Sequence, residues 1–279
     1  MEKTRILASL ATIALTASAL SGCASTSSSD AKAQYEAKKS EIPQLVKKFS
    51  APNLGVLLND TKILKLKPEV QSAEETGSTR LGDMEAAKLL GAAKFDPEAC
   101  QAKLLDTYKD DTSIPAAFSQ AVSQDNKTLV RLQLRAHPGV KEASSVSDFQ
   151  RVFPKSCPKY TLTVAGASNG SSPAQPLTNE VTNFTADVKD YPLDGATDGL
   201  MTKLTAKPAG KVSEKAEAGS LVASESAGYT TVGIFQRIGN LELRVFFDGA
   251  HPEQDAANAK ADLQRLVTHI GQAFVAKAQ

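Results

Sequence analysis

The sequence of 279 residues contains no tryptophan, and only 5% of its residues are aromatic. Platforms that stack sugars or nucleobases depend on flat aromatic side chains, so this composition weighs against such a platform. An H-E-x-x-H pair and a glycine-rich phosphate loop after a strand are also absent. We therefore expect a protein that is not an enzyme, with no catalytic residue and no cofactor.

Neither sign of charge dominates the chain. The formal charge is +1, and residues 1–22 contribute Glu2, Lys3 and Arg5, so the remainder carries a formal charge of zero. Binding of nucleic acid requires a concentrated basic surface, which this balance does not supply. We expect no nucleic-acid partner and no strong electrostatic attraction to anionic lipid.

Long apolar runs are absent after the first 20 residues. Residues 6–20, ILASLATIALTASAL, are uncharged and follow Lys3 and Arg5. A transmembrane helix requires about 20 apolar residues, so this stretch is too short to span a bilayer comfortably. The positive start, the short apolar run and the small residues after it predict an export signal over residues 1–22.

The end of this signal, Leu20-Ser21-Gly22-Cys23, resembles the lipobox of bacterial lipoproteins. In that family the cysteine thiol takes a diacylglyceryl group, and the signal is removed so that the cysteine becomes the first residue. The resemblance implies lipidation of Cys23 and attachment to the extracytoplasmic face of the cell membrane. Two acyl chains give stable anchoring, at about 0.8 kcal/mol per buried methylene. The alternative is an ordinary secretory signal.

Only three cysteines are present, and lipidation of Cys23 leaves Cys100 and Cys157 as an even pair. Disulfides form and persist in the oxidising compartments that exported proteins enter, so this pair favours a disulfide. The alternatives are a metal pair or a catalytic thiol. A metal site requires further Cys or His ligands nearby, and the three histidines are scattered, so we expect no metal site. They are His137, His251 and His269.

The mature chain divides into a tether and one domain. Residues 24–33, ASTSSSDAKA, are small and polar, which is typical of a flexible tether. We expect the lipidated cysteine and tether to occupy residues 23–40, and a single extracytoplasmic domain to occupy residues 41–279.

Helical patterns precede strand patterns in this domain. Between residues 77 and 111 the signals are helical, with Asp83 as an expected cap, and Ile114–Phe118 is expected to begin another short helix. From residue 128 apolar and polar residues alternate with a period of two, which predicts strands.

The end of the domain has the strongest local signal. Two strand patterns, GYTTVGIFQRI and LELRVFF, flank Gly239-Asn240, a pair typical of a tight hairpin turn. Pro252 then begins a predicted long helix with apolar residues at helical spacing. These patterns predict an α+β fold, an antiparallel sheet covered by helices with a long C-terminal helix.

The arrangement after residue 83 resembles the extracellular sensor domains of actinobacteria, which occur as lipoproteins and on PknH-type kinases. Cys100 on an early helix, Cys157 before a strand and the closing hairpin with its alanine-rich helix carry this resemblance. It implies an antiparallel sheet covered by helices, with a central cleft for a ligand. The kinase domain carries two disulfides and this chain has cysteines for one, so no binding residue transfers.

These observations favour a non-catalytic, sensor-like module. We expect it to bind a small molecule, a lipid or an envelope component in a cleft. A protein-interaction lipoprotein that supports envelope machinery is the alternative, and an enzyme acting on the cell wall through scattered residues is a third hypothesis.

Overall fold

The structure is a computed structural model, and it describes residues 28–59, 61–107, 114–125, 127–167, 178–209 and 228–275. The predicted signal peptide and Cys23 lie outside the described residues. In the described part of the chain, no helix combines the length and the apolar character that crossing a membrane requires.

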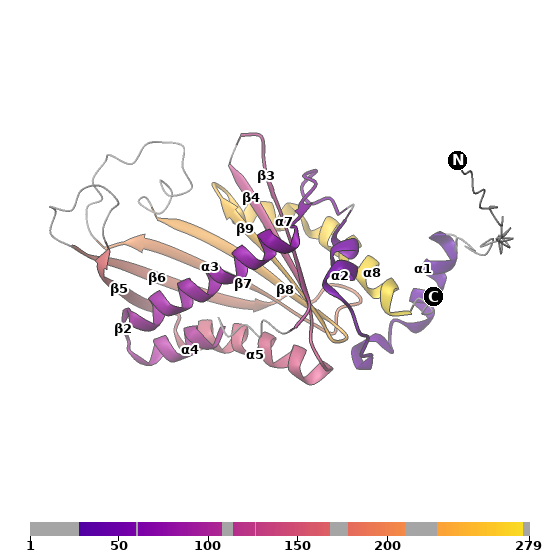
Figure 1. Ribbon diagram of the computed structural model, residues 1–279, viewed down its shortest axis with the longest axis horizontal. Helices are drawn as coiled ribbons and strands as arrows, with labels where there is room; N and C mark the ends of the chain where they lie inside the picture. Colours follow the sequence, from indigo (N-terminus) through magenta and orange to yellow (C-terminus); the bar gives the residue numbers. More distant parts are fainter. Residues whose placement is uncertain are drawn as a thin grey trace, which may run out of the picture.

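A single antiparallel sheet of nine strands forms the centre of the protein, in the order β1-β3-β4-β9-β8-β7-β6-β5-β2 (Figure 1). Most neighbours in this order are consecutive in sequence, but β4 pairs with β9, which places the last hairpin at the centre. The strands are β1 Glu69–Val70, β2 Lys94–Asp96, β3 Ala116–Val122, β4 Thr128–Ala136, β5 Lys159–Ala167, β6 Thr178–Asp190, β7 Asp198–Pro208, β8 Tyr229–Ile238 and β9 Leu241–Gly249.

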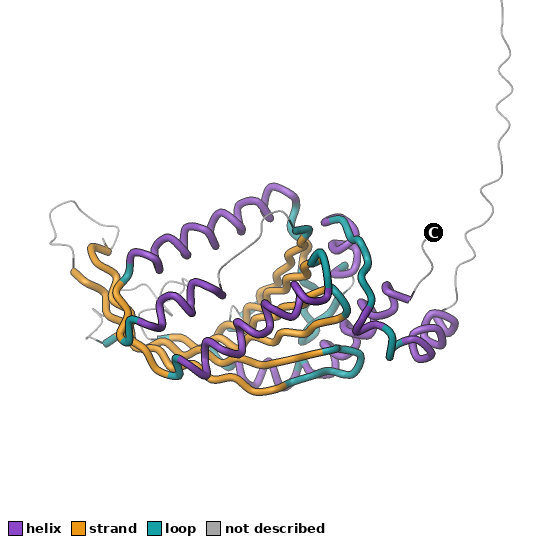
Figure 2. Tube along the Cα trace, turned by 90° about the horizontal axis from the view of Figure 1, so that it is seen from below, coloured by secondary structure: helices purple, strands orange, loops and turns teal. Residues whose placement is uncertain are grey.

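Helices cover both faces of this sheet, which confirms the predicted α+β fold. Figure 2 shows the curved sheet with helices along its concave side. The helices are α1 Ser28–Lys38, the 3-10 turn η1 Ile42–Gln44, α2 Ala51–Leu58, α3 Ala73–Ala92, α4 Ala99–Thr107, α5 Val140–Ser156, α7 Pro252–Asn258 and α8 Lys260–Val275.

Two separate apolar cores lie on opposite faces of the sheet. The larger core packs α1, α2, α7 and α8 against alternate residues of β4, β8 and β9, such as Leu134, Ile234 and Leu243. The smaller core packs α4 and α5 against β5, β6 and β7 around Tyr160 and Phe184. Because side chains alternate between the faces of a strand, the two cores use opposite residues of the same sheet.

The hairpin predicted at Gly239-Asn240 joins β8 to β9. Gly239 has φ +57°, which suits a tight turn, and Ile238 pairs with Leu241 across it. The Asn240 amide is buried, donates to the carbonyl oxygen of His137 at 2.6 Å and accepts from the backbone N–H of Lys47 at 3.0 Å. The turn therefore also holds the end of β4 and the segment before α2.

Two sequence-based predictions about local structure are wrong. Helix α3 begins ten residues before Asp83, because Ser72 and Glu75 form a reciprocal capping box. The segment Ile114–Phe118 leads into strand β3, since pairing with β4 outweighs its helical pattern. The predicted long C-terminal helix is confirmed as α8, and Pro252 begins the short helix α7 directly before it.

The start of the domain also differs from the flexible tether expected over residues 23–40. Helix α1 lies within that range, and its Tyr35 is buried in the larger core, 1% exposed. A tyrosine ring transferred into a core fixes the helix that carries it, because its burial is favourable only in the docked position.

A disulfide joins Cys100 in the first turn of α4 to Cys157 directly after α5, the pair that the sequence predicts. The two Cα atoms are 5.8 Å apart, within the usual range for a disulfide. Both cysteines are buried in the smaller core, so the bond connects two helices that cover the same face.

Reduction of this disulfide is expected to lower the free energy of unfolding by about 4 kcal/mol, because the bond closes a long loop in the unfolded chain. Denaturant unfolding with and without dithiothreitol measures the change. The double variant Cys100→Ala/Cys157→Ala is the control and is expected to be insensitive to the reductant. Equal stability of the oxidised and reduced wild-type protein would contradict this account.

Candidate functional site

The centre of the sheet contains a group of charged side chains that are almost fully buried, here called the charged cluster. It lies on strands β4 and β9, where Arg135 is the register partner of Glu242. Glu242 is 0% exposed and Arg135 is 4% exposed. The cluster consists of Arg135, His137, Glu242 and Arg244.

Both carboxylate oxygens of Glu242 accept hydrogen bonds. The Arg244 guanidinium donates through Nε to Oε1 at 2.8 Å and through Nη2 to Oε2 at 3.1 Å. His137 Nε2 lies 3.1 Å from Oε2. The contact of Arg244 with Glu242 is thus a two-point ion pair within one strand, at positions two apart on the same face.

Burial alone would raise the pKa of Glu242, because it disfavours the charged form. The charge of Arg244, the hydrogen bonds from His137 and Arg244, and the charge of Arg135 reverse this effect and lower the pKa to about 2. The carboxylate is therefore ionised at neutral pH, and it is a poor general base because it binds a proton so weakly.

The chemistry available to His137 is limited by the same contact. Among the residues that the structure describes, its imidazole bonds to Glu242 and to no hydroxyl or thiol group. A nucleophilic mechanism requires a hydroxyl or thiol within hydrogen-bonding distance of its base. The charged cluster is consequently arranged as a polar core element and lacks a nucleophile in its described surroundings.

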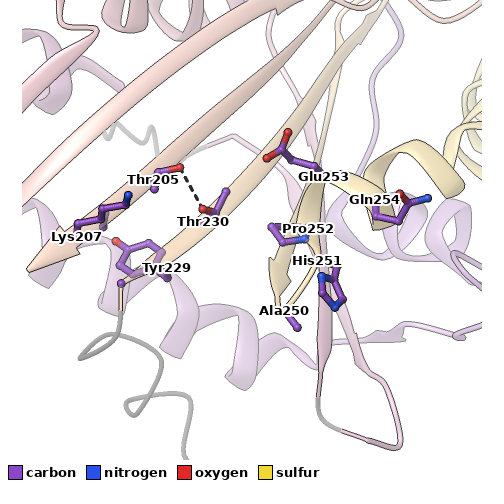
Figure 3. Close-up of a pocket in the computed structure, with 12 residues that line it drawn as sticks. Thr205, Lys207, Tyr229, Thr230, Ala250, His251, Pro252, Glu253 and Gln254 are labelled. Atoms are coloured by element: carbon purple, nitrogen blue, oxygen red, sulfur yellow. Dashed lines mark hydrogen bonds between the residues drawn. The ribbon is translucent and has the colours of Figure 1, made fainter. Parts of the chain in front are cut away.

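A hollow of about 490 Å³ lies on the opposite face, beside the start of α7 (Figure 3). Its described lining comes from the end of β7, the start of β8 and the chain between β9 and α7. The hydrogen-bonding side chains that line it are Thr205, Lys207, Tyr229, Thr230, His251, Glu253 and Gln254. We call this feature the α7 hollow.

Two glycines shape the backbone around the α7 hollow. Gly228 has φ +87° and Gly249 has φ +133°, conformations that other residues rarely adopt. A side chain at Gly249 would overlap the carbonyl oxygen of Lys127. The chain can therefore leave β9 and enter α7 at Pro252, a residue favoured in the first turn of a helix.

The polar groups of the α7 hollow are partly ordered by one another. Thr205 and Thr230 hydroxyls lie 3.1 Å apart across β7 and β8, the dashed contact in Figure 3. Beside the hollow, Lys203 forms an ion pair with Glu253. Lys207 and His251, both labelled in Figure 3, are exposed side chains of this lining. This lining offers hydrogen bonds to a polar ligand and little apolar surface to an acyl chain.

A second hollow, of about 390 Å³, follows the edge strand β1 and the neighbouring end of β3. Charged and amide side chains line it, including Lys67, Glu69 and Gln120. It is smaller than the α7 hollow and is bordered by a strand of only two residues.

The predicted histidines occupy three different surroundings. His137 is in the charged cluster, His251 lies at the α7 hollow, and His269 is exposed on α8. No group of three or more His, Cys, Asp or Glu side chains that could hold a metal ion occurs within the described residues. Sequence reasoning missed Glu242 and Arg244, although charges inside the apolar strand pattern LELRVFF are the signal that marks them.

One sequence pattern typical of nucleophile elbows is present at residues 166–170, GASNG. An elbow places its serine on a sharp turn between a strand and a helix. Here the pattern begins at the end of β5, which pairs antiparallel with the next strand β6, and Ser168 lies outside the described residues. The serine and the turn that an elbow requires therefore fall outside the described residues, and the pattern assigns no nucleophile.

No protein-family model matches the chain, and no curated protein matches it. Among solved structures, the chain is similar to the extracellular domain of PknH from Mycobacterium tuberculosis, with a TM-score of 0.33 and 13% sequence identity. The alignment covers 63% of this chain and 77% of that domain. A likeness of this size does not assign the chain to a family.

The substitution Glu242→Gln is expected to lower the free energy of unfolding at neutral pH by about 3–5 kcal/mol, because it leaves buried guanidinium groups without their carboxylate. Denaturant unfolding followed by circular dichroism measures the loss. Arg131→Gln is the matched control on the same two strands, since the Arg131–Asp248 pair is 48% exposed on the arginine side. That control is expected to cost at most about 1 kcal/mol.

Wild type and Glu242→Gln also test the pH dependence of stability. Since the pKa of Glu242 falls from 4.5 to about 2 on folding, its contribution to stability is complete above pH 4.5 and is lost as the pH falls toward 2. Wild type is expected to lose more unfolding free energy across this window than Glu242→Gln, by roughly 3 kcal/mol. Parallel curves for the two proteins would show that Glu242 is not held ionised.

Proposed function

We propose that this protein is a lipoprotein, anchored through Cys23 on the extracytoplasmic face of the cell membrane, whose domain is a non-catalytic, sensor-like binding module. The sequence Leu20-Ser21-Gly22-Cys23, placed directly after a charged start and an apolar run, carries the proposed anchoring. The disulfide Cys100–Cys157 supports it, because exported proteins fold where disulfides persist.

The α7 hollow is the ligand site in this proposal. Small-molecule sites commonly have volumes of about 300–1,000 Å³, and a hollow of about 490 Å³ falls within that range. Sites for acyl chains are lined by apolar side chains, whereas Thr205, Thr230 and Gln254 offer hydroxyl and amide groups. Of the three ligand kinds expected from the sequence, the lining favours a polar small molecule or a polar envelope component over a lipid chain.

The charged cluster supports a function without catalysis. Its carboxylate has a pKa of about 2 and both of its oxygens are already bonded. The described partners of His137 include no nucleophile. The cluster therefore has the arrangement of an internal support and lacks the acid, base and nucleophile that hydrolysis of the cell wall requires.

A protein-interaction lipoprotein is the second candidate function. Helix α5 exposes Phe149 and Val152, and helix α3 exposes Leu89, which is 62% accessible. Apolar side chains of this size at a surface are typical of protein contacts when they form one patch. Crosslinking in cells distinguishes this candidate, since it predicts a reproducible partner joined through α3 or α5.

The anchoring is tested with Cys23→Ala expressed in a bacterial host. The variant is expected to move from the detergent phase to the aqueous phase in a phase-separation assay, because it has no thiol to lipidate. The control Cys100→Ala/Cys157→Ala retains Cys23 and is expected to remain in the detergent phase. Partition of Cys23→Ala with the detergent would contradict lipid anchoring.

Ligand binding is tested by adding purified muropeptides, as polar envelope fragments, or a phospholipid mixture to isotope-labelled protein. Muropeptides are expected to shift the amide resonances of residues 205–207, 228–230, 250–251 and 253–254, with weaker shifts in Lys207→Ala. Lys88→Ala, an exposed lysine on α3, is the control and is expected to bind like wild type. Shifts at these residues that phospholipid causes and muropeptides do not would contradict the proposed site. The absence of shifts at these residues with both additions would also contradict it.

A further inference from the structure

Helix α1 is docked on the domain through the aromatic side chain of Tyr35, which is buried in the larger core. Tyr35 lies between α8 and the loop that joins β6 to β7, at two glycines. A Cβ atom at Gly271 of α8 would lie 2.5 Å from the Tyr35 ring, and one at Gly195 of the loop would overlap the Tyr35 hydroxyl. The absence of side chains at both positions therefore creates the space that Tyr35 fills.

The chain after Tyr35 is fixed at the same place. Lys39 lies 2.9 Å from Glu36 within the helix and 3.6 Å from Asp194, which belongs to the same loop as Gly195. Ile42 in η1 is fully buried in the larger core. From Tyr35 onward the polypeptide thus follows the body of the domain and has no free length to act as a spacer.

This docking shortens the distance between the domain and the proposed lipid. Five residue steps separate Cys23 from Ser28, which limits their distance to about 18 Å even for extended chain. The helix from Ser28 to Tyr35 adds about 10 Å. A free chain extending to residue 40 would instead reach about 60 Å. Docked α1 therefore keeps one end of the domain close to the lipid. This end, where α1 contacts α8, is here called the α1–α8 end.

We infer that the α1–α8 end is a membrane-facing surface, whose partner is the headgroup layer of the bilayer that holds Cys23. The inference rests on the proposed lipidation and adds an orientation to it. Exposed lysines at positions 32, 38 and 48 lie in this region, as does Val46, which is largely exposed. The exposed acids Glu36 and Glu41 lie there too, so the short connection to Cys23, and not a net charge, sets the orientation.

In this orientation the α7 hollow lies away from the bilayer. Strand β7 begins at Asp198, next to the loop that contacts Tyr35, and reaches Lys207 nine residues later. Nine residues of strand extend about 30 Å. Figure 1 shows the far ends of β5 and β6 at the pole opposite to α1. The ligand site of the proposed function thus lies in a part of the domain remote from the membrane-facing end.

The experiment measures which end of the domain meets the bilayer. Full-length lipidated protein carries a bimane label at Ala37→Cys in α1 or at Ala92→Cys at the far end of α3, both exposed alanines in helices. It is reconstituted into phosphatidylcholine–phosphatidylglycerol vesicles that contain a headgroup nitroxide lipid. We expect the label at position 37 to be quenched several-fold more strongly than the label at position 92.

Two variants test whether Tyr35 sets this difference. Tyr35→Ala is expected to release α1 and reduce the quenching difference between the two labels, because the tether then gains length. Tyr35→Phe retains the ring and is expected to preserve the difference. Equal quenching of both labels in vesicle-bound wild-type protein would overturn the orientation while leaving the anchoring intact. Failure of the wild-type protein to bind vesicles would instead overturn the lipidation, and the orientation with it.

Discussion

The ionised carboxylate of Glu242 is the constraint on which the sheet depends. It lies where β4 and β9 meet, and this pairing is the contact that places the last hairpin of the chain at the centre of the sheet. Guanidinium groups buried beside it would be strongly unfavourable alone, so the charged cluster is satisfied only when β4, β9 and the turn at Asn240 are in register. Strands that come from distant parts of the sequence are thereby aligned by charge as well as by apolar packing.

The sequence predicted those features whose signals are local. Alternation on either side of Gly239-Asn240 is sufficient to predict the hairpin, and an even number of cysteines after a predicted export signal is sufficient to predict the disulfide. The predicted start of α3 is wrong because Asp83 is also a good capping residue, while the reciprocal pair Ser72 and Glu75 stands eleven and eight residues earlier.

Other features depend on contacts between distant residues and had no local signal. The segment that became β3 has a helical pattern, and only its pairing with β4 makes it a strand. Tyr35 lies in a polar stretch typical of a tether, and the glycines that receive it are at positions 195 and 271. The candidate site also depends on contacts between distant residues, since the end of β7, the start of β8 and the start of α7 together line the α7 hollow.

The pairing of α1 with α8 brings the first and last helices of the described chain to one pole of the molecule. Under the proposed anchoring through Cys23, a fluorescent protein or affinity tag fused after α8 would lie between the domain and the membrane. Such a fusion would compete for space with the proposed attachment, whereas an insertion in a loop at the opposite pole would leave it undisturbed. For labelling and purification, helices α1 and α8 are one location.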